Sequence, residues 1–136
     1  MDYKAPDNRL YVVVGILQNV HGYVLIQQRR PGTPKPGKWE FPGGKLEEGE
    51  EPAHALEREL KEELGIEVGQ IAPLTAVTHN YDHARVWLDT YLVTEFDGEP
   101  EGREGQNIAW VSLEQIRQFD VLDAVIPIVQ AIREFR

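Results

Sequence analysis

The sequence predicts an α/β protein in which a mixed β-sheet lies between helices. Short β-branched and apolar segments recur along the chain, which is typical of strands. A segment of helical period lies near the middle, and a second helical segment closes the chain. With 136 residues and no repeat or linker, we expect one domain over residues 1–136, built around a single substantial core.

The first half of the chain is expected to hold three strands before the central helix. Residues 1–8 are polar and are expected to form a loose segment. His21 and Gly22 are typical of a turn between two strands. Residues 31–38 hold three prolines and two glycines, which predicts a loop. The expected strands are residues 10–17, 23–28 and 39–41.

The second half is expected to add three strands and two helices. The helical pattern stops at Gly65, and residues 97–105 form an acidic, glycine-rich segment that predicts a loop. Ser112 is a candidate helix cap. The expected strands are residues 71–79, 85–96 and 108–111, and the expected helices are residues 113–118 and 127–135.

The central helix is predicted over residues 52–64. Four apolar side chains recur there at spacings of three and four, so they form one buried stripe. They are Ala53, Leu56, Leu60 and Leu64. Pro52 suits a first helical position, and Gly65 suits the left-handed residue that closes a helix.

Three carboxylates gather on one flank of this helix. Glu59, Glu62 and Glu63 stand at i, i+3 and i+4. Like charges this close repel by roughly 1 kcal/mol per pair in water, and Arg58 and Lys61 offset only part of that cost. A solvated acidic face would tolerate the repulsion, whereas a divalent cation such as Mg²⁺ or Mn²⁺ would turn it into binding energy.

The approach to the helix favours the metal interpretation. Residues 39–44 run from an extended apolar segment into Gly43 and Gly44. Glycines there let the backbone and its carbonyls come close to a ligand or an ion. Bare backbone followed by clustered carboxylates therefore predicts a site for a metal and a phosphate group.

The spacing of these residues resembles that of a known family. The pattern G-x5-E-x7-R-E-U-x-E-E-x-G-U, with U apolar, is the Nudix box, and every fixed position is filled here. The matching residues are Gly44, Glu50, Arg58, Glu59, Leu60, Glu62, Glu63, Gly65 and Ile66. The chain thus resembles a Nudix hydrolase, which implies the Nudix α/β/α sandwich and a diphosphatase that requires Mg²⁺, with Mn²⁺ as a substitute.

Composition limits the classes of molecule that the protein is expected to bind. A net charge of −9 argues against binding to a nucleic-acid polymer or an anionic membrane. The absence of cysteine excludes disulfides, a thiolate nucleophile and thiolate-bound zinc. No signal sequence or membrane span is apparent, so we expect a cytoplasmic monomer that acts on a small molecule.

Basic residues precede the acidic helix. Between Arg29 and Lys45 there are five basic residues and one acidic residue, and between Glu47 and Glu63 there are eight acidic residues against two basic ones. The basic residues are Arg29, Arg30, Lys35, Lys38 and Lys45. A surface loop can be basic by chance, but beside a metal site such a segment suits the terminal phosphates of a nucleoside triphosphate.

The similarity extends to the MutT-like subgroup, whose members hydrolyse oxidised guanine nucleotides, and it spans about residues 10–132. It implies that four carboxylates and one carbonyl bind metal and that the carboxylates carry catalysis. They are Glu59, Glu62, Glu63, Glu104 and the carbonyl of Gly43. The implied substrate contacts are Arg29 (or Arg30, if the loop alignment has a one-residue gap), Phe41 and Lys45. Gly44, Glu50 and Arg58 are expected to support the site.

At the residue that reads the base, the chain departs from the subgroup. Aligning on Pro127 places Val125 where those enzymes carry an asparagine. Valine offers no hydrogen bond, so Asp123 is the candidate if the segment before the proline bulges. A carboxylate would accept from N7–H of 8-oxoguanine, or equally from the amino group of cytosine.

The implied reaction is attack of water on a nucleoside triphosphate, which releases a nucleoside monophosphate and pyrophosphate. We expect 8-oxo-dGTP as substrate. The alternatives are a CTP-type or broad-specificity nucleotide diphosphatase and, more distantly, a nucleotide-binding module without turnover. The intact Glu59, Glu62, Glu63 and Gly44 favour the enzyme.

Overall fold

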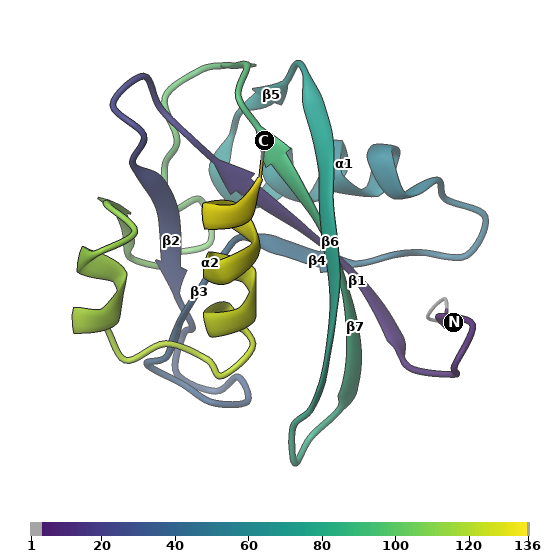
Figure 1. Cartoon of the computed structure of the whole chain (residues 1–136). Coiled ribbons are helices and arrows are strands. Elements are labelled where there is room, and N and C mark those ends of the chain that lie inside the picture. The colour runs from purple at the N-terminus through teal and green to yellow at the C-terminus, as the bar shows by residue number, and fades with distance from the viewer. Residues whose placement is uncertain (1–3, 136) are drawn as a thin grey trace.

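Two α-helices pack on opposite faces of a layer of short β-sheets (Figure 1). This computed structural model describes residues 4–135. The elements in chain order are β1 (Leu10–Leu17), β2 (Val24–Gln28), β3 (Trp39–Glu40), β4 (Gly43–Lys45), α1 (Pro52–Leu64), β5 (Glu67–Val68), β6 (Ile71–Asn80), β7 (Arg85–Val93), β8 (Phe96–Asp97), β9 (Ile108–Val111), the 3₁₀ helix η1 (Gln115–Gln118) and α2 (Val125–Glu134). The predicted α/β/α arrangement is confirmed.

The largest sheet is mixed, as the sequence predicted. Its strand order is β4-β1-β7-β6, in which β1 and β7 run parallel and the other neighbours run antiparallel. The parallel pairing is in register from Leu10↔Val86 to Leu17↔Val93. A second sheet has the order β3-β2-β9, and β5 pairs with β8. Because β3 and β4 belong to different sheets, the segment between them carries the chain from one sheet to the other.

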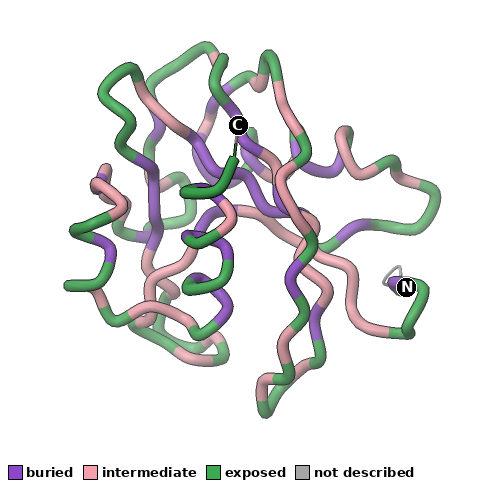
Figure 2. Tube along the Cα trace, viewed as in Figure 1, coloured by how far each residue is buried: buried purple, intermediate pink, exposed green. Residues whose placement is uncertain are grey.

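The side chains of β1 alternate between two hydrophobic clusters. Val13 and Leu17 pack with Leu56, Leu60 and Leu64 of α1. Val14 and Ile16 belong to the cluster formed with α2. This period of two is expected for a strand that is covered on both faces. Figure 2 shows the resulting buried layer between the helices.

Both ends of α1 follow the predicted signals. Pro52 lies in its first turn, and Gly65 closes it with φ 75° while its N–H donates to the carbonyl of Lys61 at 3.0 Å. The predicted apolar stripe is wrong at one position: Ala55, not Ala53, is fully buried. The most deeply buried face of the helix is centred on Leu56, Leu60 and Leu64, and Ala53 lies at the margin of that face.

Several other expected boundaries shift because pairing partners are distant in sequence. The glycine turn after residue 41 is in fact a strand, β4, which pairs with β1. The expected strand 85–96 divides into β7 and β8, and η1 replaces the expected helix 113–118. Helix α2 begins at Val125, two residues before Pro127.

The N-terminal segment expected to be loose lies partly outside the described residues, since these begin at Lys4. Within them, Lys4 forms a bridge to Leu10 and Ala5 is 4% exposed. No helix within residues 4–135 has the length and apolar character needed to cross a membrane.

Candidate active site

The three carboxylates of α1 differ in their surroundings although they lie within five residues. The Glu62 side chain is 57% exposed, that of Glu59 is 16% exposed, and Glu63 is buried. The helix therefore presents Glu63 to the sheet, Glu59 to strand β4 and Glu62 to solvent. The predicted flank is real, and it runs from the protein surface into the core.

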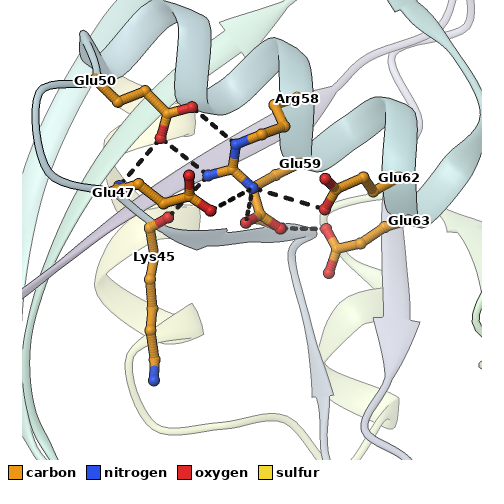
Figure 3. Close-up of polar contacts among 8 residues, drawn as sticks. Lys45, Glu47, Glu50, Arg58, Glu59, Glu62 and Glu63 are labelled. Atoms are coloured by element: carbon orange, nitrogen blue, oxygen red, sulfur yellow. Dashed lines mark hydrogen bonds and ion pairs between the residues drawn. The ribbon is translucent and has the colours of Figure 1, made fainter. Parts of the chain in front are cut away.

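Arg58 organises the outer half of the site (Figure 3). It donates from Nε and Nη2 to both oxygens of Glu50, at 2.8 and 2.9 Å. Its Nη1 donates to Glu59 at 2.8 Å and lies 3.6 Å from Glu62. The guanidinium also donates to the carbonyl of Lys45 at 3.2 Å. Arg58 thereby ties the helix to the loop and to β4, and the structural role of Glu50 and Arg58 in the site stays a prediction.

Glu63 is held by a chain of buried amides. Gln27 of β2 donates to its Oε1 at 3.2 Å, and the backbone N–H of Gly43 donates to its Oε2 at 3.1 Å. Gln106 donates to the side-chain oxygen of Gln27 and to the carbonyl of Glu63, both at 3.1 Å. The oxygen of Gln106 in turn accepts from the backbone N–H of Glu104 at 2.9 Å.

Glu104 therefore lies at the site although it is 41 residues beyond Glu63 in sequence. Both residues line a pocket of about 150 Å³ together with basic and amide side chains. The other lining residues are Gln27, Gln28, Arg29, Arg30, Thr33, Glu40 and Gln106. The Glu104 carboxylate also bears electrostatically on Glu59 and Glu63.

Burial and mutual repulsion raise the pKa of two of the carboxylates, Glu59 and Glu63. The pKa of Glu63 rises to about 8, chiefly because the group is buried and further because Glu59, Glu104 and Glu40 surround it; the Gln27 hydrogen bond acts in the opposite direction. The pKa of Glu59 is also raised, first by burial, against the lowering effect of Arg58. Converging carboxylates that are costly to ionise are what a cation would stabilise.

Gly43 and Gly44 lie where the backbone packs too closely for a side chain. A Cβ on Gly44 would overlap the carboxylate of Glu59, and one on Gly43 would overlap the carbonyl of Val13. The backbone of β4 thus approaches both α1 and β1 more closely than any side chain would permit.

The donor set fits a hard divalent cation such as Mg²⁺ or Mn²⁺. Glu59, Glu62, Glu63 and Glu104 supply carboxylate oxygens, which these ions prefer. Within residues 4–135, no three acidic or histidine side chains are already arranged to hold an ion. The reason is visible in the contacts: Glu59 turns to Arg58, and Glu63 turns to Gln27 and Gly43.

A larger cleft of about 760 Å³ is lined in part by β4. Its inner wall is apolar, and its rim carries charged side chains that include Lys45 and Arg85. The apolar wall consists of Val12, Val14, Phe41, Leu88, Leu122, Ala124, Val125 and Ile128, joined by Tyr81. Phe41 is 5% exposed and Val125 is 2% exposed, so both form the floor rather than the mouth.

Arg29 and Glu40 line both cavities and mark where they meet. Arg29 donates to Glu40 at 3.0 Å and to the carbonyl of Pro34. Burial raises the pKa of Glu40 despite this partner. Arg30 is exposed and lines only the smaller pocket. Of the two arginines considered from the sequence, Arg29 reaches both cavities, and the assignment of the nucleotide contact stays a prediction.

The two candidates for reading the base lie in different places. Val125 lines the cleft, whereas Asp123 is absent from the lining. The Asp123 side chain is 80% exposed and lies 3.6 Å from Nε2 of His79. The prediction that Asp123 contacts the base is untested.

Sequence reasoning missed four residues of the site: Gln27, Glu40, Tyr81 and Gln106. Only Glu40 carried a signal, as the one acidic residue of the basic segment. The glutamines carry no charge and match no fixed position of the box, so only the pairing of β2 with β9 brings them beside Glu63.

Known proteins similar to this chain share its sequence pattern and its fold. The NUDIX domain model matches residues 8–132. A relative from Proteus vulgaris named 8-oxo-dGTP diphosphatase is 41% identical over 97 residues, which is 71% of this chain and 87% of that protein. A relative from Escherichia coli (strain K12) named CTP pyrophosphohydrolase is 34% identical over 125 residues, 92% of each chain. A solved structure from work on MutT of Aliivibrio salmonicida and Vibrio cholerae superposes with a TM-score of 0.79 at 39% identity, over 93% of this chain and 99% of that chain.

Proposed function

The chain belongs to the NUDIX family of hydrolases, and from this premise we propose that it hydrolyses 8-oxo-dGTP to 8-oxo-dGMP and pyrophosphate with Mg²⁺ as its cofactor. NUDIX hydrolases act on nucleotide substrates and generally need a divalent metal ion. What we propose beyond these family properties is the base, 8-oxoguanine, and the ion, Mg²⁺. We further propose that the chain works as one domain and as a monomer.

The observation that carries the proposal is the junction of the two cavities. The acidic pocket with Glu63 and Glu104 meets the apolar cleft at Arg29 and Glu40. A nucleoside triphosphate has the same division, with charged phosphates at one end and a flat base at the other. A cleft of about 760 Å³ has room for a purine nucleoside.

The acidic pocket and the neighbouring carboxylates of α1 suit the phosphate end. Glu59, Glu62, Glu63 and Glu104 would hold the ion, with the Gly43 carbonyl as a further ligand. A bound divalent cation supplies charge neutralisation on the phosphates and lowers the pKa of the attacking water. A glutamate, Glu59 or a neighbour, would accept the proton of that water as the water oxygen bonds to phosphorus and the phosphoanhydride bond between the nucleoside monophosphate and the pyrophosphate breaks.

The basic residues suit binding of the phosphates. Arg29 stands between the cavities, and Arg30 lies on the side of the acidic pocket. Lys45 stands at the rim of the cleft. Their cationic groups donate charge-assisted hydrogen bonds to phosphate oxygens. Phe41 and Val125, on the floor of the cleft, offer flat and aliphatic surface to the base.

A CTP-type activity is the second candidate, because the relative named CTP pyrophosphohydrolase matches 92% of this chain. Asp123, if it reached the base, would accept from the cytosine amino group as well as from N7–H of 8-oxoguanine. The base, and not the reaction, separates the two candidates.

The experiment is a kcat/KM panel with 8-oxo-dGTP, dGTP, CTP, dCTP and ADP-ribose in Mg²⁺. We expect 8-oxo-dGTP to exceed dGTP by about 100-fold or more, since a site built around one polar group discriminates strongly against a mispaired base. Equal rates for dGTP and 8-oxo-dGTP, or a lead for CTP, would reject the proposed substrate while leaving the hydrolase intact.

A further inference from the structure

Tyr81 places a hydroxyl group beside the apolar residues that line the cleft. It follows β6 directly, at the base of the tight hairpin that leads into β7, where its N–H donates to the carbonyl of Ala84 at 2.9 Å. Its phenol oxygen accepts a hydrogen bond from the backbone N–H of Ala124 at 3.0 Å. Ala124 and Val125 line the same cleft, and both are apolar.

The hydrogen bond with Ala124 leaves the hydroxyl proton free to donate. An N–H group only donates, so the phenol oxygen is the acceptor and its own proton remains available. Among residues 4–135, no group accepts that proton. Burial raises the pKa of Tyr81 above its usual range, and the charges of Asp123 and Glu40 act in the same direction. The phenol therefore stays neutral and keeps its proton at physiological pH.

Two histidine rings contact the ring of Tyr81. The ring centroids of His79 and Tyr81 are 4.3 Å apart, and His83 stacks on Tyr81 at 5.5 Å with an interplanar angle of 18°. With its oxygen also anchored at Ala124, the tyrosine is locked in place before any ligand arrives. A preorganised donor loses little conformational freedom on binding.

From these contacts we infer that the Tyr81 hydroxyl is a specificity-determining donor, which selects bases that present a carbonyl oxygen over bases that present an amino group at the same edge. The inference rests on the proposed nucleotide hydrolysis but not on which nucleotide is preferred. A purine with a 6-oxo group receives a hydrogen bond, whereas a 6-amino group turns N–H toward the O–H. Tyr81, at the hairpin between β6 and β7, would thus provide the hydrogen bond to the base that Val125 cannot make.

Tyr81→Phe removes the donor and keeps the ring. The test compares kcat/KM for dITP and dGTP, which carry 6-oxo, with that for dATP, which carries 6-amino. We expect the variant to lose about ten-fold on dITP and dGTP and less than about two-fold on dATP. The pyrimidines dUTP (4-oxo) and dCTP (4-amino) are measured in parallel. The variant should lose kcat/KM on dUTP and not on dCTP.

The same measurement distinguishes a specificity role for the hydroxyl from a purely structural one. If its only function were to hold Ala124 at the start of α2, Tyr81→Phe would lower every kcat/KM alike, and the inference would be overturned. Tyr91→Phe is the matched control, since Tyr91 is also partly buried and its hydroxyl donates to Asp89, outside the cleft. It should leave the oxo-to-amino ratio unchanged.

A second variant covers the case in which Tyr81→Phe melts too low to assay. Fluorinated tyrosine at position 81 keeps the ring and the acceptor for Ala124 but ionises at a lower pH. As the assay pH rises through its pKa, the phenolate can accept but not donate. The oxo-to-amino ratio should then fall, and a ratio that does not change with pH would overturn the inference. A wild-type lead for CTP over 8-oxo-dGTP would reject the proposed substrate alone, whereas a wild-type preference for dCTP over dUTP would overturn the inference on Tyr81.

Discussion

Gln27 donates a hydrogen bond from Nε2 to Oε1 of Glu63 at 3.2 Å, so a neutral amide on β2 orients a buried carboxylate on α1. The bond favours the ionised form of Glu63, because an N–H donor lowers the pKa that burial has raised. A carboxylate must be ionised to bind a cation, so Gln27 is expected to tune metal affinity.

Gln27→Met should therefore weaken metal binding. The variant removes the donor at nearly constant volume, so protons compete better for Glu63. We expect the Mg²⁺ concentration for half-maximal activity to rise about three- to ten-fold near pH 7 and to return toward wild type near pH 9. Gln130→Met is the control, because Gln130 also donates to a glutamate, Glu134, at 2.8 Å, but on the exposed face of α2. A shift that is independent of pH would indicate that Gln27 acts through packing alone.

The stability of the metal-free protein should fall as pH rises. The pKa of Glu63 is about 8 in the folded protein against 4.5 for an unperturbed glutamate, so the folded state holds the proton more tightly between these values. Ionising Glu63 in this window costs folding free energy, and stability is lost as pH rises toward 8. We expect the Tm in chelator to decrease from about pH 5 to pH 8, and Glu63→Gln to flatten that slope. A slope equal to that of wild type in Glu63→Gln would assign the effect to other groups.

Hydrolysis should require the carboxylates of α1 and an added divalent ion. Glu59→Gln and Glu62→Gln each keep the size of the side chain and are expected to lower kcat by about 100-fold or more. Excess chelator should abolish turnover, and Mg²⁺ should raise the Tm of wild type more than that of either variant. Glu57→Gln, on the same helix but exposed, is the control. Full activity in chelator would reject the metal requirement.

Glu104 should contribute to activity although it lies outside the helix. Glu104→Ala removes a carboxylate from the acidic pocket, so we expect a fall in kcat or in metal affinity of about ten-fold or more, with an unchanged Tm. Glu101→Ala is the matched control, since Glu101 is an exposed glutamate of the same loop that does not line the pocket. Wild-type kinetics for Glu104→Ala throughout a metal titration would make it a surface charge.

Local sequence determined the elements whose signals lie within a few residues. Helix α1 follows from Pro52, its apolar spacing and Gly65, because capping and helical period are local properties. The flank with Glu59, Glu62 and Glu63 follows from the same period. The spacing of the Nudix box residues identified the family.

Tertiary structure alone decided which distant groups complete the site. Strand β4 exists only because β1 pairs with it, so residues 43–45 carry no strand signal of their own. Gln27 and Gln106 meet Glu63 because β2 pairs with β9, and Tyr81 meets Ala124 because the hairpin of β6 and β7 lies against the start of α2. Periodicity tells which face of an element is buried, but the partner on that face is set by the packing of the whole chain. That is why α1 and its carboxylates could be predicted from the sequence, whereas the amides beside Glu63 and the hydroxyl in the cleft could not.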